Sequence, residues 1–170
     1  MENILGYKCF DEEMKNCYGK QFEVGKIYID YGNPTFGKGG HGFHMCKNLE
    51  DTLRYFDGVD KKINICLVIG SGKISTGFDD YNEYYDMYSV EKLKIIKKLS
   101  RNEIISLALN LDEVRIKRFI MSFRLTKEEI IKFKEKFKYN NEVIKFIEYY
   151  QENNKNAFEV RTPQIRIKKY

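Results

Sequence analysis

Apolar and polar residues alternate through much of the first hundred residues, which is the pattern of strands with one buried face. Four segments show this pattern or a short apolar run: residues 6–10, 21–29, 43–46 and 92–99. A fifth, residues 63–69, is the most apolar and is rich in β-branched side chains, so it is predicted to be the central strand. Gly70 and Gly72 are then expected to turn the chain into a further strand at 73–78.

Beyond Ser100 the spacing of apolar residues changes to the period of helices. Ser100 with Glu103, and Thr126 with Glu129, have the spacing of capping boxes, in which side chains satisfy the first amides of a helix. Two further helix starts are predicted, at Asp112 and at Asn140 or Asn141. The second half of the chain is therefore expected to be helical.

One short helix is expected within the strand-rich half, over residues 49–56, with Asn48 as its N-cap. Strands followed by helices predict an α+β fold, with a mostly antiparallel N-terminal sheet and three to four C-terminal helices. We expect a core domain at residues 1–105 and a helical extension at 106–170. The extension is predicted to end in an extended arm over residues 159–169.

The composition is that of a folded protein with a sizeable core, since 42% of the 170 residues are hydrophobic. No run approaches 18 apolar residues, so no membrane-spanning helix is expected. The N-terminus lacks the basic start and apolar centre of a signal peptide. The four cysteines have no framework spacing. Reduced thiols and a cytoplasmic location are the prediction.

The net charge of +5 is unevenly distributed. Residues 1–90 hold 10 basic and 14 acidic residues, and residues 91–170 hold 20 and 11. Such an asymmetry is typical of a chain whose basic half meets an anionic partner, including non-specific contact with nucleic acid. The candidate contacts are Lys94, Lys98, Arg115 and Arg118. The alternative is an ordinary solvated surface rich in lysine.

Residues 37–56 are the one stretch that looks like a site, because both histidines lie in a glycine-rich loop and the strand that follows it. Gly39, Gly40 and His41 are candidates for binding an anion through backbone amides. The loop has no Gly-Lys-Ser/Thr ending and does not open directly onto a helix, so it is not a P-loop. A plain connection between strands is the alternative.

Zinc binding is a second hypothesis for this stretch, because His41, His44 and Cys46 are ligand types within six residues. A structural site needs a fourth ligand, and the spacing matches no common zinc motif, so no metal is predicted. A nucleophilic dyad of Cys46 or Cys66 with either histidine is a third hypothesis. The alternative is that Cys46 packs as a small apolar residue and His41 is solvated.

Three segments carry a resemblance to a known family: GYKCF at residues 6–10, FEVGKIY at 22–28 and GFHMCKN at 42–48. In these segments, and in KLKIIKKLS at 92–100, the chain resembles a small uncharacterised domain that is common in phage and prophage genomes. The resemblance covers roughly residues 5–105. It implies an intracellular protein with an anti-defence role.

A second resemblance is to ADP-ribosyltransferase-like folds, which place a glycine loop before a strand of the kind seen at Gly42–His44 and then a helix. It implies an NAD pocket lined by Tyr7 or Lys8 and by His44, with Tyr55 stacked on the nicotinamide. The catalytic glutamate of such enzymes has no clean match, and Glu83 and Glu91 are the candidates.

Two functions are therefore carried forward. The first is a phage-type protein without enzymatic activity or cofactor that binds a host protein or nucleoprotein complex, in the manner of an anti-CRISPR inhibitor. The second is an ADP-ribosyltransferase-like enzyme that uses NAD. Convergence of Tyr7, His44 and a carboxylate in one cleft would favour the enzyme. We expect instead that His44 packs beneath the helix that follows it.

Overall fold

In the computed structural model, the described residues are 3–36, 40–55, 62–76 and 87–153, and they belong to two compact units. The first unit spans Met1–Arg124 and the second spans Leu125–Tyr170. The predicted domain boundary at residue 105 therefore stays a prediction. The predicted arm at 159–169 lies outside the described residues.

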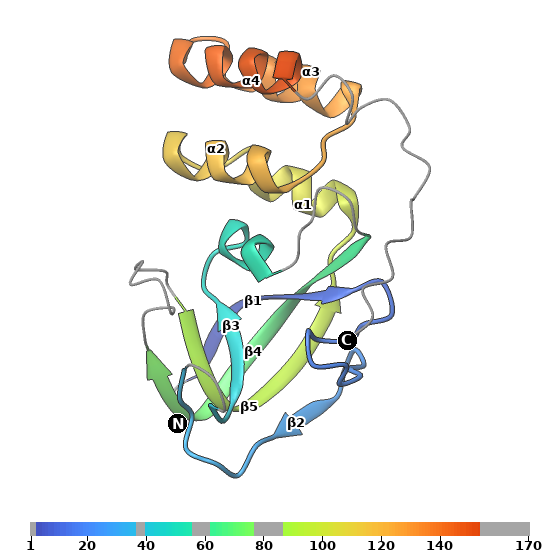
Figure 1. The fold of residues 1–170 in the computed structure, drawn as a ribbon, viewed down its shortest axis with the longest axis vertical. Coiled ribbons are helices and arrows are strands. Elements are labelled where there is room, and N and C mark those ends of the chain that lie inside the picture. Colours follow the sequence, from blue (N-terminus) through green and yellow to red (C-terminus); the bar gives the residue numbers. More distant parts are fainter. Residues whose placement is uncertain (1–2, 37–39, 56–61, 77–86, 154–170) are drawn as a thin grey trace, which may run out of the picture. The chain divides into compact units, whose positions relative to one another are not determined.

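Five antiparallel strands form the first unit's sheet, in the order β2-β5-β3-β1-β4: β1 (Ile4–Asp11), β2 (Ile27–Ile29), β3 (Phe43–Cys46), β4 (Ile63–Thr76) and β5 (Met87–Lys98). Strand β5 also pairs with β4, so β5, β3, β1 and β4 close into a small barrel, with β2 continuing from β5 (Figure 1). The α+β prediction is confirmed, with an antiparallel N-terminal sheet ahead of the helices.

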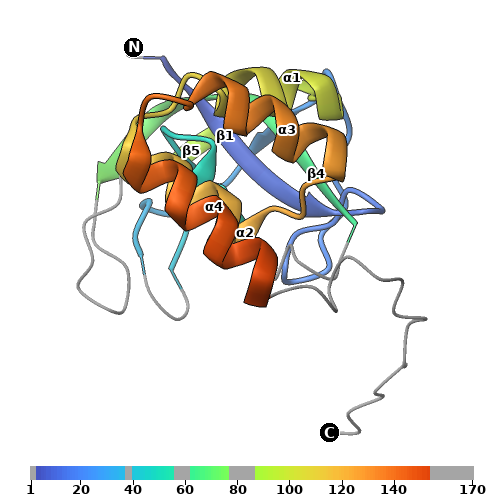
Figure 2. The same cartoon turned by 90° about the horizontal axis from the view of Figure 1, so that it is seen from above.

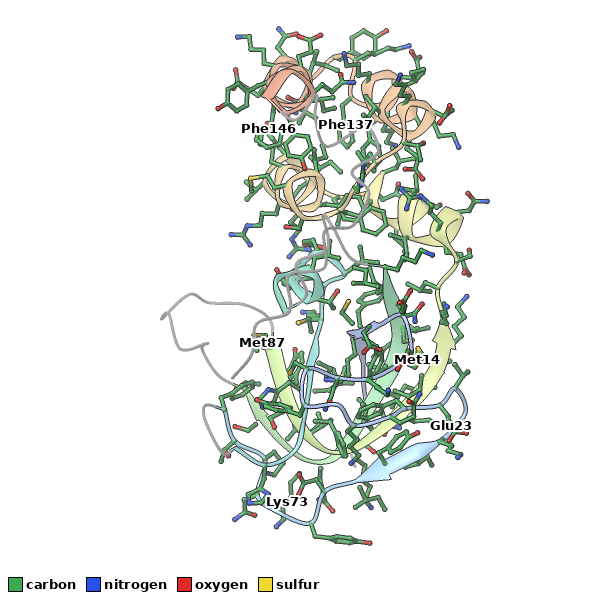
Figure 3. The ribbon with its side chains drawn as sticks, turned by 45° about the vertical axis from the view of Figure 1, so that its right-hand side comes forward. Met14, Glu23, Lys73, Met87, Phe137 and Phe146 are labelled. Carbon is green, nitrogen blue, oxygen red and sulfur yellow. The ribbon has the colours of Figure 1, made fainter. Side chains whose placement is uncertain are left out.

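Side chains that alternate along the strands fill the barrel, as the pattern of the sequence predicts. Their cluster consists of Phe10, Phe22, Phe43, Met45, Cys66, Val68, Val90, Leu93 and Ile95. Met14, from the segment after β1, packs against this cluster (Figure 3). The interior is therefore aromatic at the end where β1, β3 and the segment before β2 meet.

Gly6 allows β1 and β3 to approach closely. A Cβ atom at this position would lie 2.4 Å from the carbonyl oxygen of Cys46 and 2.6 Å from Cε of Met45. Both distances are far shorter than real contacts, so no other residue fits without a shift of the backbone. The barrel is closed at this point by the Tyr7–Cys46 pair.

The predicted turn at Gly70 and Gly72 is wrong, because β4 runs through both positions as one long strand. The register to β5 shifts between Ser71 and Ile74, and Gly72 has a φ of +84°, so the glycine supports a bulge instead of a turn. The strand predicted at 21–29 is shortened to β2, since Gly25, with a φ of +86°, ends the preceding turn.

Helical elements of the first unit are a 3-10 helix η1 (Glu50–Tyr55), α1 (Arg101–Ala108) and α2 (Glu113–Ser122). The second unit contains α3 (Lys127–Lys136) and α4 (Asn141–Asn153), which lie side by side (Figure 2). Both predicted capping boxes are present, at Ser100 and Thr126. Within the described residues, no helix has the length and apolar character needed to cross a membrane.

Candidate functional site

A pocket of about 450 Å³ opens where β1 and β3 separate. The two strands are paired at Tyr7 and Cys46, and both residues of this pair belong to the pocket lining. Strand β1 lines the pocket with Tyr7–Cys9 and β3 lines it with Phe43–Cys46. The remaining wall comes from three places: the loop at residues 16–20, the three residues Asp30, Gly40 and Gly42 between β2 and β3, and Thr52 of η1. Its lining is thus drawn from segments that are far apart in the sequence.

Lys8 has an unusual environment for a lysine. Its neighbours at alternate positions of β1 are Gly6 and Phe10, whose ring belongs to the barrel core. The ammonium nitrogen lies 2.5 Å from the carbonyl oxygen of His44, to which it donates across the gap between the strands. It also lies 5.8 Å from the centre of the Phe10 ring. Among the described side chains, no carboxylate forms an ion pair with Lys8.

Burial lowers the pKa of Lys8 from its ordinary value of 10.5. The cause is desolvation of the ammonium by burial. The residue is half-buried, so it is surrounded by protein on most sides and reached through the pocket. A desolvated cation with a neutral acceptor is a natural site for an anionic group.

Asp30, directly after β2, is hydrogen-bonded to two glycine amides at the edge of the pocket. Its carboxylate accepts hydrogen bonds from the amides of Gly32 and Gly42, each at 2.9 Å. Nδ1 of His41 lies 3.4 Å from the same carboxylate. The two amide hydrogen bonds keep the pKa of Asp30 below its ordinary value. The amide of Gly42, directly after the predicted anion-binding residues Gly39, Gly40 and His41, is therefore already bonded to a carboxylate of the protein itself.

His44 lies at the wall of the pocket and is not packed beneath the following helix as expected. Its ring stacks on Phe36, with the ring centres 5.0 Å apart. Nε2 of His44 lies 3.1 Å from the carbonyl oxygen of Thr35, so the ring contacts the glycine loop. The stacking fixes one side of the ring, while the residue still contributes to the pocket surface.

Tyr7, Lys8, His44 and Asp30 therefore line a single pocket. Gly40 is also part of the lining. The other candidates for the anion and NAD sites are not among the described residues of this lining. His41 is exposed, Gly39 and Glu83 lie outside the described residues, and only the backbone of Tyr55 is described, as part of η1.

Glu91, the second candidate for a catalytic glutamate, does not belong to the pocket lining. Its carboxylate accepts a hydrogen bond of 2.9 Å from the amide of Lys73, beside the β4 bulge. The carboxylate that does reach the pocket belongs to Asp30, which sequence reasoning missed. Lys20 and Thr52 were missed as well, because nothing in their local sequence points to a pocket.

The basic residues predicted to contact an anion are spread over the first unit. Lys94 and Lys98 lie exposed on β5. Nε of Arg115 lies 3.4 Å from Glu50 Oε1 and 3.6 Å from Asp112 Oδ2. Nη1 of Arg118 lies 3.9 Å from Asp51. The two arginines therefore pair with carboxylates of the same unit.

The hypotheses of a metal site and of a Cys66 nucleophile gain no geometric support. In the part of the chain that the structure describes, no group of three or more histidine, cysteine or acidic side chains is arranged to hold a metal ion. Burial raises the pKa of Cys9 to about 12 and that of Cys66 to about 11, so both thiols are protonated at neutral pH. Cys66 also faces the barrel core, with its sulfur 3.9 Å from that of Met14.

A family described as a domain of unknown function, DUF7666, matches residues 4–107, which include every residue of the pocket lining. No curated protein matches the chain. Since the match covers more than half of the chain, from β1 to nearly the end of α1, the chain belongs to the DUF7666 family.

Proposed function

We propose that the protein binds a small anionic ligand in the pocket between β1 and β3, and that Lys8 holds the negative group. The observation that carries the proposal is the Lys8 ammonium, which is desolvated and has a neutral carbonyl as its hydrogen-bond acceptor. An anion placed there would form an ion pair with the ammonium, for which the described residues of the free protein supply no partner. Structural lysines are usually found in water or beside a carboxylate.

The ligand class is a nucleotide with a planar ring, of which NAD and ADP-ribose are the examples. Tyr7, Phe43 and His44 belong to the lining, so aromatic side chains contribute to the surface that a planar ring would meet. The volume of about 450 Å³ falls within the range of small-molecule sites. The likeness to ADP-ribosyltransferase-like folds supports the same class of ligand.

ADP-ribosyl transfer is a narrower proposal than binding. Asp30, which the structure places at the pocket, accepts two amide hydrogen bonds and has a lowered pKa, so it is engaged as an anion within the loop. A transferase would need a further carboxylate beside the bound ribose. Binding of the ligand is therefore the central proposal, and transfer of its ADP-ribose group is the separate activity to assay.

Isothermal titration of ADP-ribose and NAD into the full chain tests the proposal. We expect the Lys8→Met variant to bind about 30-fold more weakly or worse, which is the effect of losing a charge-assisted contact. Lys94→Met is the matched control, because Lys94 is an exposed strand lysine outside the pocket. Equal affinities for wild type and Lys8→Met, or no binding by the wild type, would contradict the proposal.

Consumption of NAD is measured in the same samples. Labelled NAD is incubated with the full chain and a host lysate, and a transferase is expected to label a target. His44→Ala is then expected to abolish the label. If the protein binds NAD but does not consume it, the ligand-binding proposal is retained and the transferase activity is rejected.

A second proposal is that the protein docks on a host protein or nucleoprotein complex and inhibits a defence system, as the phage-type resemblance implies. One observation favours it. Four large apolar residues are exposed on β2 and its flanks: Val24, Ile27, Ile29 and Tyr31. Strand β2 lies at the end of the strand order, and exposed apolar residues on an edge strand are typical of an interaction surface.

Capture from a host lysate under competing salt tests docking. The variant Ile27→Glu with Ile29→Glu is expected to lose a saturable partner, because two charges would be buried in the contact. Ile131→Glu, an equally exposed isoleucine of α3, is the control. Docking through β2 would be contradicted if the β2 variant captured the same partner as the wild type. It would also be contradicted if every captured protein were lost at moderate salt.

A further inference from the structure

Lys20 occupies an aromatic cage at the edge of the pocket. Its ammonium nitrogen lies 4.8 Å from the ring centre of Phe43 and 5.7 Å from the ring centres of Phe22 and Tyr28. All three distances are within the reach of a cation–π interaction. Lys20 and Phe43 belong to the pocket lining, whereas Phe22 and Tyr28 do not, so the cage borders the pocket through Lys20 and Phe43.

The rings of the cage are held rigidly. Phe22 packs against Tyr28 at 4.7 Å and against Phe43 at 6.1 Å, and Phe10 supports Phe22 from the core at 5.0 Å. The hydroxyl of Tyr28 accepts a hydrogen bond of 2.7 Å from the amide of Glu23. Phe22 and Phe43 are buried and both contact Tyr28, so packing fixes the positions of the three rings.

Lys20, in contrast, is held loosely. It is an exposed residue in a short loop that the bridge between Lys15 and Gln21 closes. Among the described residues, no carboxylate pairs with its ammonium and no acceptor receives a hydrogen bond from it. Three ring faces are thus its contacts, and each interaction of this kind is weak at an exposed site.

We propose that this cage is a binding site for an organic cation, and that Lys20 is the group which the ligand displaces. The exchange is favourable because a lysine ammonium is strongly hydrated and regains its water on leaving, whereas a quaternary ammonium or a pyridinium is weakly hydrated. One cation replaces another, so the charge against the three rings is unchanged. Each ring keeps its negative face toward a positive group.

The inference rests on the proposed function in one respect, which is that the anionic part of the same ligand meets Lys8. Phe10 and Phe22 contact each other, with ring centres 5.0 Å apart, and each meets one of the two lysines: the Lys8 ammonium is 5.8 Å from the centre of the Phe10 ring and the Lys20 ammonium is 5.7 Å from that of Phe22. Lys8 and Lys20 both belong to the pocket lining, so a single ligand that carries an anionic group and an organic cation would have a partner for each. Phosphocholine and oxidised nicotinamide mononucleotide both have this chemistry.

Two pairs of probes isolate the contribution of the positive charge. Phosphocholine is compared with the phosphate of 3,3-dimethylbutanol, which has the same shape without the charge. Oxidised nicotinamide mononucleotide is compared with its reduced form, in which the ring is neutral. We expect the cationic member of at least one pair to bind the full chain several-fold more tightly than its neutral partner, and the pair that responds identifies the source of the cation.

The variant Lys20→Ala sharpens the test, because it empties the cage and changes an exposed side chain. The affinity for the cationic probe is expected to rise about three-fold or more, and that for its neutral partner to stay within two-fold. Lys26→Ala, an exposed lysine paired with Glu23, is the control and is expected to change neither. Tyr28→Leu is expected to reduce the preference for the cationic member.

Equal binding of charged and neutral members in both pairs, with no gain in Lys20→Ala, would overturn the cage proposal. This failure is separate from that of the proposed function, because ADP-ribose carries no organic cation and reports on Lys8 alone. If ADP-ribose binding depends on Lys8 but the charged and neutral probes bind equally, the anion site is retained and the cation site is rejected.

Discussion

Two regions of the first unit bury a charged side chain, and they differ in the partner that the protein provides for the charge. At the pocket, the Lys8 ammonium meets a neutral carbonyl and an aromatic face. At the contact between η1 and α2, the Glu50 side chain is 1% exposed and faces the guanidinium of Arg115 at 3.4 Å. The charge of opposite sign is supplied by the protein in the second region, whereas in the first region the described residues supply none.

The difference separates a structural charge from a functional one. A buried charge must be neutralised or paired, and the protein pairs Glu50 with its own arginine. Neither oxygen of Glu50 accepts a hydrogen bond from the described residues, so even this pairing is incomplete, and burial raises the pKa of its carboxyl. Lys8 lies at an open pocket, where a ligand could supply the missing partner.

The largest effect on stability is expected from Arg115→Met. It would leave Glu50 buried without a cation, and breaking such a pair costs about 2 kcal/mol here, which is less than for a fully buried pair because Arg115 is 40% exposed. Chemical denaturation measures the loss. In a Glu50→Gln background the same substitution is expected to cost much less, since no buried charge remains, and an equal cost in both backgrounds would contradict the pairing.

Lys8→Met is expected to act in the opposite direction and to stabilise the free protein by about 1 kcal/mol, because it removes a desolvated charge and keeps the shape. The pH dependence has a definite sign. The lowered pKa of Lys8 destabilises the wild type below that pKa, and the penalty disappears as the pH rises toward 10.5. The advantage of Lys8→Met should therefore shrink between neutral pH and 10.5. A lower stability of Lys8→Met at neutral pH would show that the ammonium is already well compensated.

Asp30→Asn tests the glycine loop that completes the pocket. Two amide hydrogen bonds to the carboxylate become weaker when its charge is removed, and the expected cost is about 1 kcal/mol. The lowered pKa of Asp30 gives stability that is present above the ordinary value of 3.8 and lost as the pH falls through the lower pKa. Wild type and Asp30→Asn should converge in stability at strongly acidic pH, and a constant difference from pH 3 to 7 would be inconsistent with a charged acceptor.

The smallest effect is expected from Glu50→Gln alone. Because the pKa of Glu50 is raised, the wild type is penalised as the pH rises above 4.5 and through the higher folded-state value. Glu50→Gln cannot ionise, so its stability should match that of the wild type near pH 4 and exceed it slightly at pH 7. Thermal unfolding at the two pH values measures the change. A variant that is less stable at pH 7 would mean that the Arg115 interaction outweighs the cost of burial.

The fold class could be predicted because it depends on local patterns. Alternation along β1 and β5 and the capping boxes at Ser100 and Thr126 are each contained in a few residues. The turn expected at Gly70 and Gly72 was wrong for a non-local reason. Pairing with β5 along almost the whole strand stabilises β4 more than two glycines weaken it, so Gly72 becomes a bulge.

The site could be predicted only in part. Tyr7 and His44 were singled out through motifs, and the structure brings them into one pocket. Lys20 and Asp30 could not be found in this way, because their roles depend on rings and amides supplied by other segments, such as Phe43 and Gly42. The alternation of side chains along β1 contained one signal for Lys8. Lys8 is two residues from the barrel residue Phe10, so both side chains are on the same face of the strand.

The pKa of Lys8, followed by NMR of the full chain labelled with ¹³C-lysine, tests the central claim most directly, and Lys8→Met assigns the signal. In the free protein we expect Lys8 to titrate below 10.5, the ordinary value. Saturation with ADP-ribose should raise this pKa, because a bound anion favours the charged amine. A Lys8 that titrates at its ordinary value, or that keeps the same pKa when ADP-ribose binds, would contradict the claim that this lysine is the anion-binding group of the pocket.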